Sequence, residues 1–247
     1  MLNRNSFSIR LADLVIKVYP VCSATEDYCK NYLCEEKADF AVSVQPEDIY
    51  YEREKSVRED LKENREIRSF SDRYLETLAL YRKIAEKMLE YNVLLFHGSC
   101  VAVDGVGYLF TAPSGTGKST HTRLWREHFG SRAVMVNDDK PLIAVRENEV
   151  RVYGTPWNGK HNLGENISVH LKAVCILERG VENKIERIDR FSAYPALLQQ
   201  AYRPGNTEKL SGLLMLLEEL GDKVPLYRMN CNMNPDAAET AYNGMND

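Results

Sequence analysis

Residues 112–119 read Ala-Pro-Ser-Gly-Thr-Gly-Lys-Ser, and these residue types and spacing are those of a phosphate-binding loop. Such a loop turns from a strand into a helix, and its backbone N–H groups surround a phosphate. Lys118 would then contact the β- and γ-phosphates, while the Ser119 hydroxyl would bind Mg²⁺. We therefore predict a nucleotide site in which ATP is held by the loop and the helix start, at Ser114, Gly115, Thr116, Gly117, Lys118, Ser119 and Thr120.

The flanking residues decide whether this loop pattern is meaningful, because Ala112 stands where the usual pattern has Gly. Upstream, the apolar runs 101–103 and 108–110 are separated by an Asp-Gly turn, which predicts a β-hairpin. Downstream, residues 118–129 have helical apolar spacing and end at Gly130. These flanks are the strand and helix that the motif requires. The alternative is a Gly-Ser surface turn followed by an unrelated helix.

A second candidate element is the apolar run 133–136 followed by Asn137, Asp138 and Asp139. Only one predicted helix separates it from the loop, so the two carboxylates would lie near a metal ion on Ser119. Successive strand side chains point to opposite faces, so in extended chain Asp138 and Asp139 have different roles. The alternative is a polar turn before Pro141.

Four segments in this order resemble the catalytic domain of HPr kinase/phosphorylase, which belongs to the wider phosphoenolpyruvate carboxykinase-like fold. The resemblance covers roughly residues 91–180 and rests on His97-Gly98, the loop 113–119, Asn137-Asp138-Asp139 and Gly154-Thr155-Pro156. It implies an α/β P-loop fold with a mixed, partly antiparallel sheet. Members phosphorylate a serine hydroxyl on a protein, using ATP or in some cases pyrophosphate, and can run the reverse phosphorolysis.

The sequence departs from that family after the acidic strand. The Glu-Ile-Arg-Gly-rich signature of the family is missing, and residues 157–166 take its place. The resemblance therefore implies ATP binding and phosphoryl transfer, but not the HPr substrate. The acceptor would be a serine-like hydroxyl of a protein, a peptide or a small molecule. The segment 155–166, with Lys160 and His161, either closes over phosphates or an acidic substrate, or is a solvated loop.

Phosphoryl transfer requires positioning, charge neutralisation and a base. Lys118 and Mg²⁺ would neutralise the phosphates, Asp138 would accept the hydroxyl proton, and Asp139 would bind the metal with Ser119. The division between Asp138 and Asp139 stays open. His97 is either a further acid/base or γ-phosphate contact, as the resemblance implies, or a packed core histidine.

Two other functions compete with this kinase hypothesis. One is a nucleotide-binding regulator or simple ATPase, in which the acidic pair only holds metal and no acceptor is phosphorylated. The other is a decarboxylating carboxykinase, which is disfavoured because the chain is short and has no recognisable set of substrate-binding arginines.

Composition limits the partners and the compartment. The net charge of −4, with no concentrated basic face, argues against a nucleic-acid partner. No apolar run approaches the ~20 residues that span a bilayer, and the N-terminus lacks a signal-peptide core. We expect a cytoplasmic protein with no membrane partner, and its six cysteines, which include no Cys-x-x-Cys pair, fit a reducing compartment. The family resemblance also suggests a homo-oligomer.

The chain divides into a β-rich N-terminal subdomain, residues 1–69, and a kinase-like catalytic domain, residues 70–247. The first has strand-like runs at 7–18, 40–44 and 49–51, forming a small β layer, and a charged connector at 53–68. The second begins with a helix over 71–91. After the site we expect strands at 171–177, 184–188 and 224–229 and helices at 191–202, 207–220 and 235–242.

Overall fold

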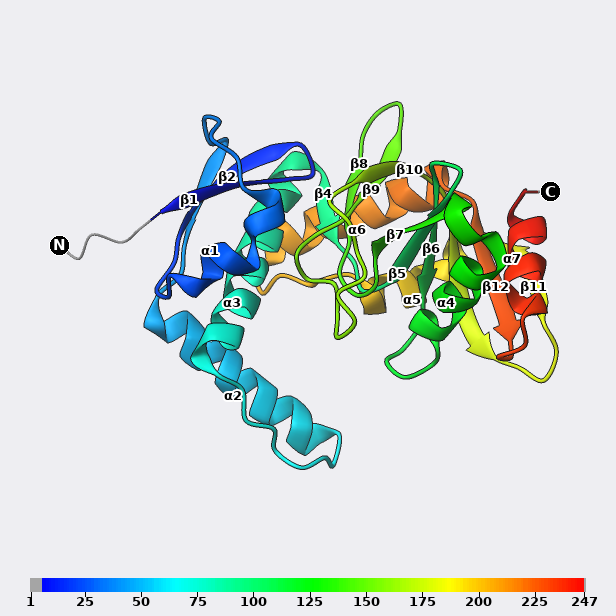
Figure 1. Cartoon of the computed structure of the whole chain (residues 1–247), viewed down its shortest axis with the longest axis horizontal. Coiled ribbons are helices and arrows are strands. Elements are labelled where there is room, and N and C mark those ends of the chain that lie inside the picture. The colour runs from blue at the N-terminus through cyan, green and yellow to red at the C-terminus, as the bar shows by residue number, and fades with distance from the viewer. Residues whose placement is uncertain (1–5, 247) are drawn as a thin grey trace. The chain divides into compact units, whose positions relative to one another are not determined.

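The computed structural model describes residues 6–246, and the contacts within it divide the chain into two compact units, Met1–Lys87 and Met88–Asp247 (Figure 1). Helix α3 (Asp72–Met88) therefore falls almost entirely in the first unit. The predicted domain boundary, between residues 69 and 70, lies in the loop before this helix.

The first unit contains a three-stranded sheet in the order β1-β2-β3. Strands β1 (Phe7–Leu11) and β2 (Leu14–Tyr19) are antiparallel, and β3 (Phe40–Ser43) is parallel to β2. The hairpin turns through Ala12 and Asp13, with φ values of 49° and 66°. Positive φ at both central positions is what the right-handed twist of a hairpin favours in a two-residue turn. The predicted small β layer is thus present.

Helices form the rest of this unit, and here the sequence prediction was partly wrong. The predicted strand 49–51 and most of the predicted connector 53–68 belong to one helix, α2 (Pro46–Lys62). Its start explains the difference, because Pro46 occupies the first turn and Gln45 and Asp48 cap each other reciprocally. The shorter helices α1 (Ala24–Tyr28) and η1 (Lys30–Tyr32) precede β3.

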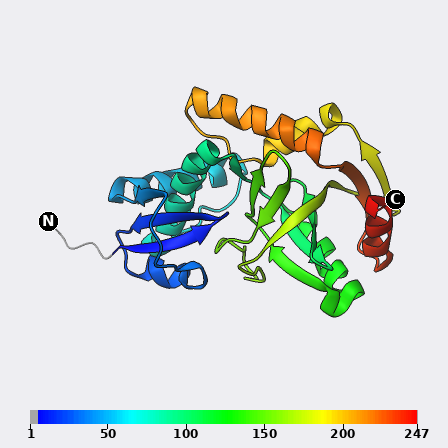
Figure 2. The same ribbon diagram turned by 90° about the horizontal axis from the view of Figure 1, so that it is seen from above.

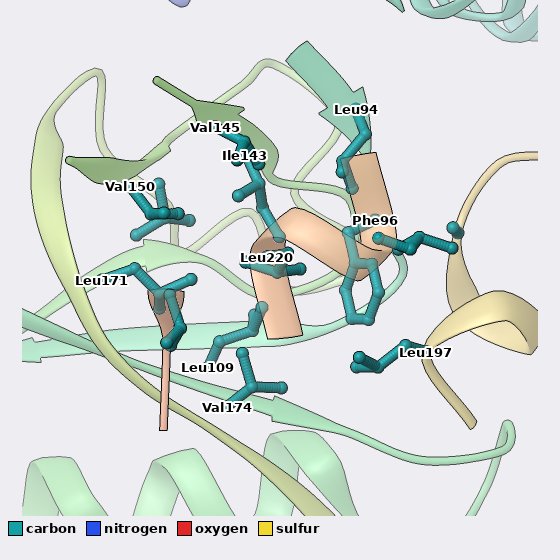
Figure 3. Close-up of a cluster of buried hydrophobic side chains, with 14 of the residues drawn as sticks. Leu94, Phe96, Leu109, Ile143, Val145, Val150, Leu171, Val174, Leu197 and Leu220 are labelled. Carbon is teal, nitrogen blue, oxygen red and sulfur yellow. The ribbon is translucent and has the colours of Figure 1, made fainter. Parts of the chain in front are cut away.

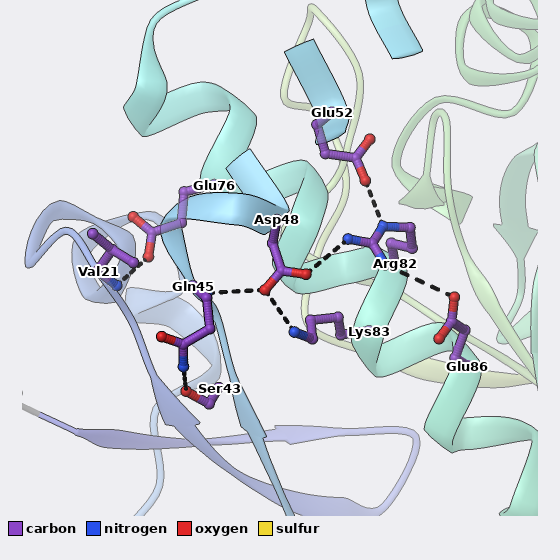
Figure 4. Close-up of polar contacts among 9 residues, drawn as sticks. All are labelled: Val21, Ser43, Gln45, Asp48, Glu52, Glu76, Arg82, Lys83 and Glu86. Carbon is purple, nitrogen blue, oxygen red and sulfur yellow. Dashed lines mark hydrogen bonds and ion pairs between the residues drawn. The ribbon is translucent and has the colours of Figure 1, made fainter. Parts of the chain in front are cut away.

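A network of charged side chains joins α2 to α3 (Figure 4). Arg82 Nε donates to Glu52 Oε1 at 2.6 Å, and Arg82 Nη2 donates to Asp48 Oδ1 at 3.2 Å. Lys83 Nζ donates to the other Asp48 oxygen at 2.6 Å. Burial alone would raise the pKa of Asp48, but its bonds to Lys83, to the Gln45 N–H and to Arg82 lower it.

The second unit is built on a nine-stranded mixed sheet within the described residues. The order β4-β8-β9-β10-β6-β5-β7 accounts for seven strands, and β12 pairs with both β10 and β11. The strands are β4 (Val93–Leu95), β5 (Ser99–Val103), β6 (Val106–Thr111), β7 (Ala133–Asn137), β8 (Leu142–Val145), β9 (Val150–Tyr153), β10 (Ser168–Arg179), β11 (Lys184–Ile188) and β12 (Leu226–Cys231).

The long strand β10 organises this sheet. It pairs in parallel with β6 and β12 and antiparallel with β9, whereas β5 pairs antiparallel with both β6 and β7. The unit is therefore α/β with a mixed, partly antiparallel sheet, as predicted. The predicted hairpin consists of β5 and β6, and it brings β7 to the edge next to β5.

Helices cover both faces of this sheet. Alternate residues of a strand point to opposite faces, so the sheet contributes to two separate hydrophobic cores. Leu109 of β6 belongs to one core (Figure 3), whereas its neighbours Tyr108 and Phe110 belong to the other, with Trp125. Figure 2 shows α6 (Thr207–Lys223) on one side of the sheet and α4 (Lys118–Phe129) on the other. Helix α5 (Arg190–Gln200) packs against α6, and α7 (Asp236–Asn246) packs against α4. The short turns η2 (Leu89–Tyr91) and η3 (Gly130–Arg132) complete the unit.

The other predicted elements of the second unit are present, with ends that shift by a few residues. Both tryptophans, Trp125 and Trp157, are buried. All six cysteines are free thiols. Within residues 6–246, no helix has the length and apolarity needed to cross a membrane.

Candidate functional site

The loop 112–117 joins the end of β6 to the start of α4, where the motif requires it. Gly115 and Gly117 have φ values of 78° and 128°, which residues with a side chain rarely adopt. Gly117 caps α4, and no side chain bonds to the helix start there. The first N–H groups of a helix have no partner within it, so this terminus can accept an anion. Ser119 and Thr120 lie in the first turn of the same helix.

Lys118 lies inside the loop rather than in solvent. Its ammonium donates to the Ala112 carbonyl at 2.8 Å, and its side chain is buried. Burial lowers the pKa of Lys118, while the charges of Asp139 and Asp138 act in the opposite direction. A buried cation with only backbone acceptors and two carboxylates nearby is suited to bind a phosphate oxygen.

Asn137 shapes the acidic strand end. Its side-chain oxygen accepts from the N–H of Asp139 at 2.9 Å and from the N–H of Lys140 at 2.7 Å. Its amide nitrogen donates to Thr155 Oγ1 at 3.0 Å and to Asn158 Oδ1 at 2.8 Å. One fully buried amide thus forms the turn that carries both carboxylates and connects that turn to residues 155–158.

The two carboxylates have different surroundings. Asp138 is buried, 7% exposed, and accepts from the Ser99 hydroxyl at 2.6 Å. Asp139 is 30% exposed, with Lys140 Nζ 3.8 Å from Oδ2. Strand β7 ends at Asn137, so both carboxylates lie in the bend that follows and the alternation of an extended strand does not apply to them. This difference is compatible with different roles, but it assigns neither.

His97 connects the start of β5 to the acidic turn. Its Nδ1 lies 2.7 Å from the Gln200 amide oxygen, and its Nε2 lies 3.6 Å from Asp139 Oδ1. Because an amide oxygen only accepts, Nδ1 carries the proton of the neutral ring and Nε2 faces Asp139. Burial and the charge of Lys118 lower the pKa of His97, whereas Asp139 and Gln200 raise it.

These interactions bring four of the predicted residues together. His97 precedes β5, Lys118 begins α4, and Asp138 and Asp139 follow β7. The charge of Lys118 acts on His97, and both carboxylates act on Lys118. The backbone is joined as well, since Gly98 N–H donates to the Asp139 carbonyl at 3.0 Å. The site combines a cation, two carboxylates and a neutral imidazole beside a helix N-terminus.

Besides Gln200, which bonds to His97, three further residues of this site were not predicted. Ser99 and Thr122 bond to each other at 2.9 Å beside Asp138, and Arg179 at the end of β10 donates to the Gly115 carbonyl at 2.6 Å. One of them carried a sequence signal, because Thr122 is four residues after Lys118 in a predicted helix and so shares a face with it. Ser99 begins β5 two residues after His97, which lies outside the strand, so alternation along the strand does not relate the two. Arg179 is distant in sequence from the loop.

The segment 155–166 is only partly the open loop considered above. Residues 155–158 are buried, whereas 159–163, including Lys160 and His161, are exposed. Gly159 marks the change: its φ is 69°, and a Cβ there would lie 3.2 Å from the Cβ of Asp139, closer than an ordinary van der Waals contact. The exposed part therefore starts directly beside the acidic turn.

The fold and the site describe an α/β protein with a mixed sheet and a charged site, in which a lysine, a histidine and two neighbouring carboxylates lie around a glycine-rich loop. A family model described as "SynChlorMet cassette protein ScmC" matches residues 65–236, so the chain belongs to this family. No match appears among curated proteins. Among solved structures, the chain is similar to the HPr(Ser) kinase/phosphatase from Coxiella burnetii, with 11% identity and a TM-score of 0.34. That match covers 60% of this chain and 94% of the other.

Proposed function

We propose that this protein is an ATP-dependent phosphotransferase that moves the γ-phosphoryl group to a serine-like hydroxyl. One observation carries the proposal: the buried carboxylate of Asp138 and the buried ammonium of Lys118 share a site but do not neutralise each other by a direct bond. Lys118 bonds to a backbone carbonyl, and Asp138 bonds to a hydroxyl. Both charges therefore remain available, one for phosphate and one for a proton.

In the proposed reaction, the acceptor oxygen forms a bond to the γ-phosphorus while the bond from that phosphorus to the β–γ bridging oxygen breaks. The acceptor proton passes to the Asp138 carboxylate, and the bond electrons leave with ADP. Lys118 and the N-terminal amides of α4 bind the phosphate oxygens. His97, uncharged because burial and Lys118 lower its pKa, contacts the transferring group or orients Asp139.

Mg²⁺ is the cofactor implied by this proposal. Among residues 6–246, no group of three or more histidine, cysteine or acidic side chains could hold a metal by itself. A phosphate-bridging Mg²⁺ needs only one or two protein oxygens, and the hydroxyl of Ser119 with the carboxylate of Asp139 is a suitable donor set. When bound, the ion neutralises charge on the phosphates.

Transfer from γ-labelled ATP into fractionated peptides, proteins and metabolites tests the proposal. We expect a labelled acceptor with the wild-type protein and with Asp104→Asn, and loss of that label with Asp138→Asn. Asp104 is the matched control because its carboxylate lies in the exposed β5–β6 turn, paired with Arg132.

Two other outcomes would contradict the kinase assignment. Tight ATP binding without a labelled acceptor would favour a nucleotide-binding regulator. Release of labelled inorganic phosphate at equal rates in the wild type and Asp138→Asn would favour an ATPase in which this carboxylate takes no proton from an acceptor.

A further inference from the structure

A buried chain of hydroxyl groups ends on Asp138. Ser99 Oγ lies 2.6 Å from Asp138 Oδ1, and Thr122 Oγ1 lies 2.9 Å from Ser99 Oγ. All three residues are buried, with exposed fractions of 0% for Ser99, 1% for Thr122 and 7% for Asp138. They come from β5, α4 and the turn after β7, so the chain crosses three elements.

The hydrogen bonds from Thr122 to Ser99 to Asp138 all run in one direction, because each hydroxyl has a single proton to donate. An ionised carboxylate only accepts, so the Ser99 proton points to Asp138. Ser99 must then accept from Thr122, whose proton points to Ser99. The other acceptors of Thr122 are weaker, since the carbonyls of Lys118 and Ser119 lie 3.3 and 3.4 Å away.

We propose that Ser99 and Thr122 are positioning residues that hold the Asp138 carboxylate in one orientation for the reaction. This inference rests on the proposed function for its kinetic part. Ser99 occupies Oδ1, which leaves Oδ2 as the oxygen that receives the acceptor proton. Thr122 acts only through Ser99, and it ties that orientation to the helix that begins at Lys118.

The hydrogen-bonded hydroxyls connect Asp138 to helix α4, so they do more than fill space in the core. Thr122 lies one helical turn after Lys118, so the base and the phosphate-binding lysine are held relative to each other by two short hydrogen bonds. Transfer requires the acceptor oxygen and the γ-phosphorus to meet in line, and a displacement of about 1 Å can reduce a rate about 100-fold. A hydroxyl chain that fixes Asp138 against α4 provides this alignment.

Steady-state kinetics of phosphoryl transfer test the proposal. We expect Ser99→Ala to lower kcat at least about tenfold while KM for ATP changes less than about twofold. Ser99→Thr, which keeps a hydroxyl, should retain most of the rate. Thr122→Val should lower kcat by a smaller factor, and Thr122→Ser should not. Thr77→Val is the matched control, because Thr77 is a buried threonine whose hydroxyl donates to a backbone carbonyl in the first unit.

The double variant gives the sharpest result. If Thr122 acts only through Ser99, adding Thr122→Val to Ser99→Ala produces no further loss of kcat. Independent, multiplying losses would overturn the directional chain. Equal kcat in Ser99→Ala and the wild type would overturn the positioning role itself.

A measurement without turnover separates this inference from the proposed function. Three-bond couplings to the Asp138 carboxyl carbon report its χ1 rotamer in solution. We expect one rotamer in the wild type and in Ser99→Thr, and averaging in Ser99→Ala. If the wild type transfers no phosphate, the proposed function fails, but these couplings still show whether Ser99 holds Asp138 in one orientation. If transfer occurs but the couplings are equal in all variants, only the positioning role of Ser99 and Thr122 is overturned.

Discussion

Two groups of buried charges, those on helix α2 and those around the glycine-rich loop, are held in different ways. In the first unit, buried Glu52 pairs with Arg82, and buried Asp60 accepts from the guanidinium and the backbone N–H of Arg68. In the second unit, buried Lys118 and Asp138 bond to a backbone carbonyl and to a hydroxyl. A buried charge without an opposite partner reduces stability.

This difference distinguishes charges that stabilise the fold from the charges to which we assign a role in the proposed reaction. Paired charges join α2 to α3 and have no capacity left for a ligand. The charged groups around the glycine-rich loop have no direct bond to an opposite charge. In the proposed function, a phosphate supplies the opposite charge for Lys118, and a proton neutralises Asp138. The second unit tolerates these buried charges because two hydrophobic cores, one on each face of its sheet, stabilise it independently of the site.

The largest effect should follow removal of the unpaired cation. We expect Lys118→Met to reduce transfer at least about 100-fold, because a charge that stabilises the transferring phosphate is lost. Its free energy of unfolding should change little, since the buried ammonium bonds directly only to backbone carbonyls and loses only the attraction of the nearby Asp138 and Asp139 charges. Denaturant unfolding and transfer assays measure both, with exposed Lys184→Met as the control. A large loss of stability would break the comparison between the units.

The opposite result is expected in the first unit. Arg82→Met removes the close partner of buried Glu52 and leaves only Lys55 Nζ at 3.8 Å, so we predict a loss of about 3 kcal/mol in unfolding free energy. Glu59→Gln, an exposed change on the same helix as Glu52, should have almost no effect. Unfolding in urea at neutral pH measures the difference. Equal stability of Arg82→Met and the wild type would show that these pairs are not structural.

His121 allows a pH test in the second unit. It is buried between Phe110 and Trp125, and burial lowers its pKa from 6.5 to about 4. The unfolded chain binds this proton near pH 6.5 and the folded protein only near pH 4. Stability from this residue is therefore complete above pH 6.5 and falls by about 3 kcal/mol as the pH drops to 4.

The variant that tests this is His121→Gln. Its unfolding free energy should depend less on pH between 4 and 6.5 than that of the wild type, whereas exposed His170→Gln should leave the slope unchanged. Parallel curves for His121→Gln and the wild type would exclude a buried neutral histidine at this position.

The smallest effect concerns Arg179, an exposed charge that contacts the loop from the end of β10. Its guanidinium donates to the Gly115 carbonyl at 2.6 Å and so holds one peptide group of the loop. We expect Arg179→Gln to weaken ADP binding by about threefold to tenfold, which corresponds to one modest hydrogen bond. Calorimetric titration measures it, with Arg187→Gln as the control. Unchanged affinity would leave Arg179 as a surface residue.

Local patterns predicted the elements that carry the site. The hairpin of β5 and β6, the helix after Lys118 and the strand before Asn137 all depend on turn residues and apolar periodicity that lie close together in sequence. The prediction was wrong at residues 49–51. Apolar and aromatic residues there resembled a strand, but the cap formed by Gln45 and Asp48 starts a helix. A reciprocal cap is a weak signal when its residues are Gln and Asp.

By itself, the sequence determined which chemistry is possible: a glycine-rich loop with Lys118 and Ser119, followed by Asp138 and Asp139 at a strand end. Only the tertiary structure decided how those groups are held. Ser99, Thr122, Arg179 and Gln200 reach the site through contacts between strands and helices, many of them distant in sequence. Their roles depend on which atoms come within hydrogen-bonding distance after packing, and no local pattern in the chain encodes that.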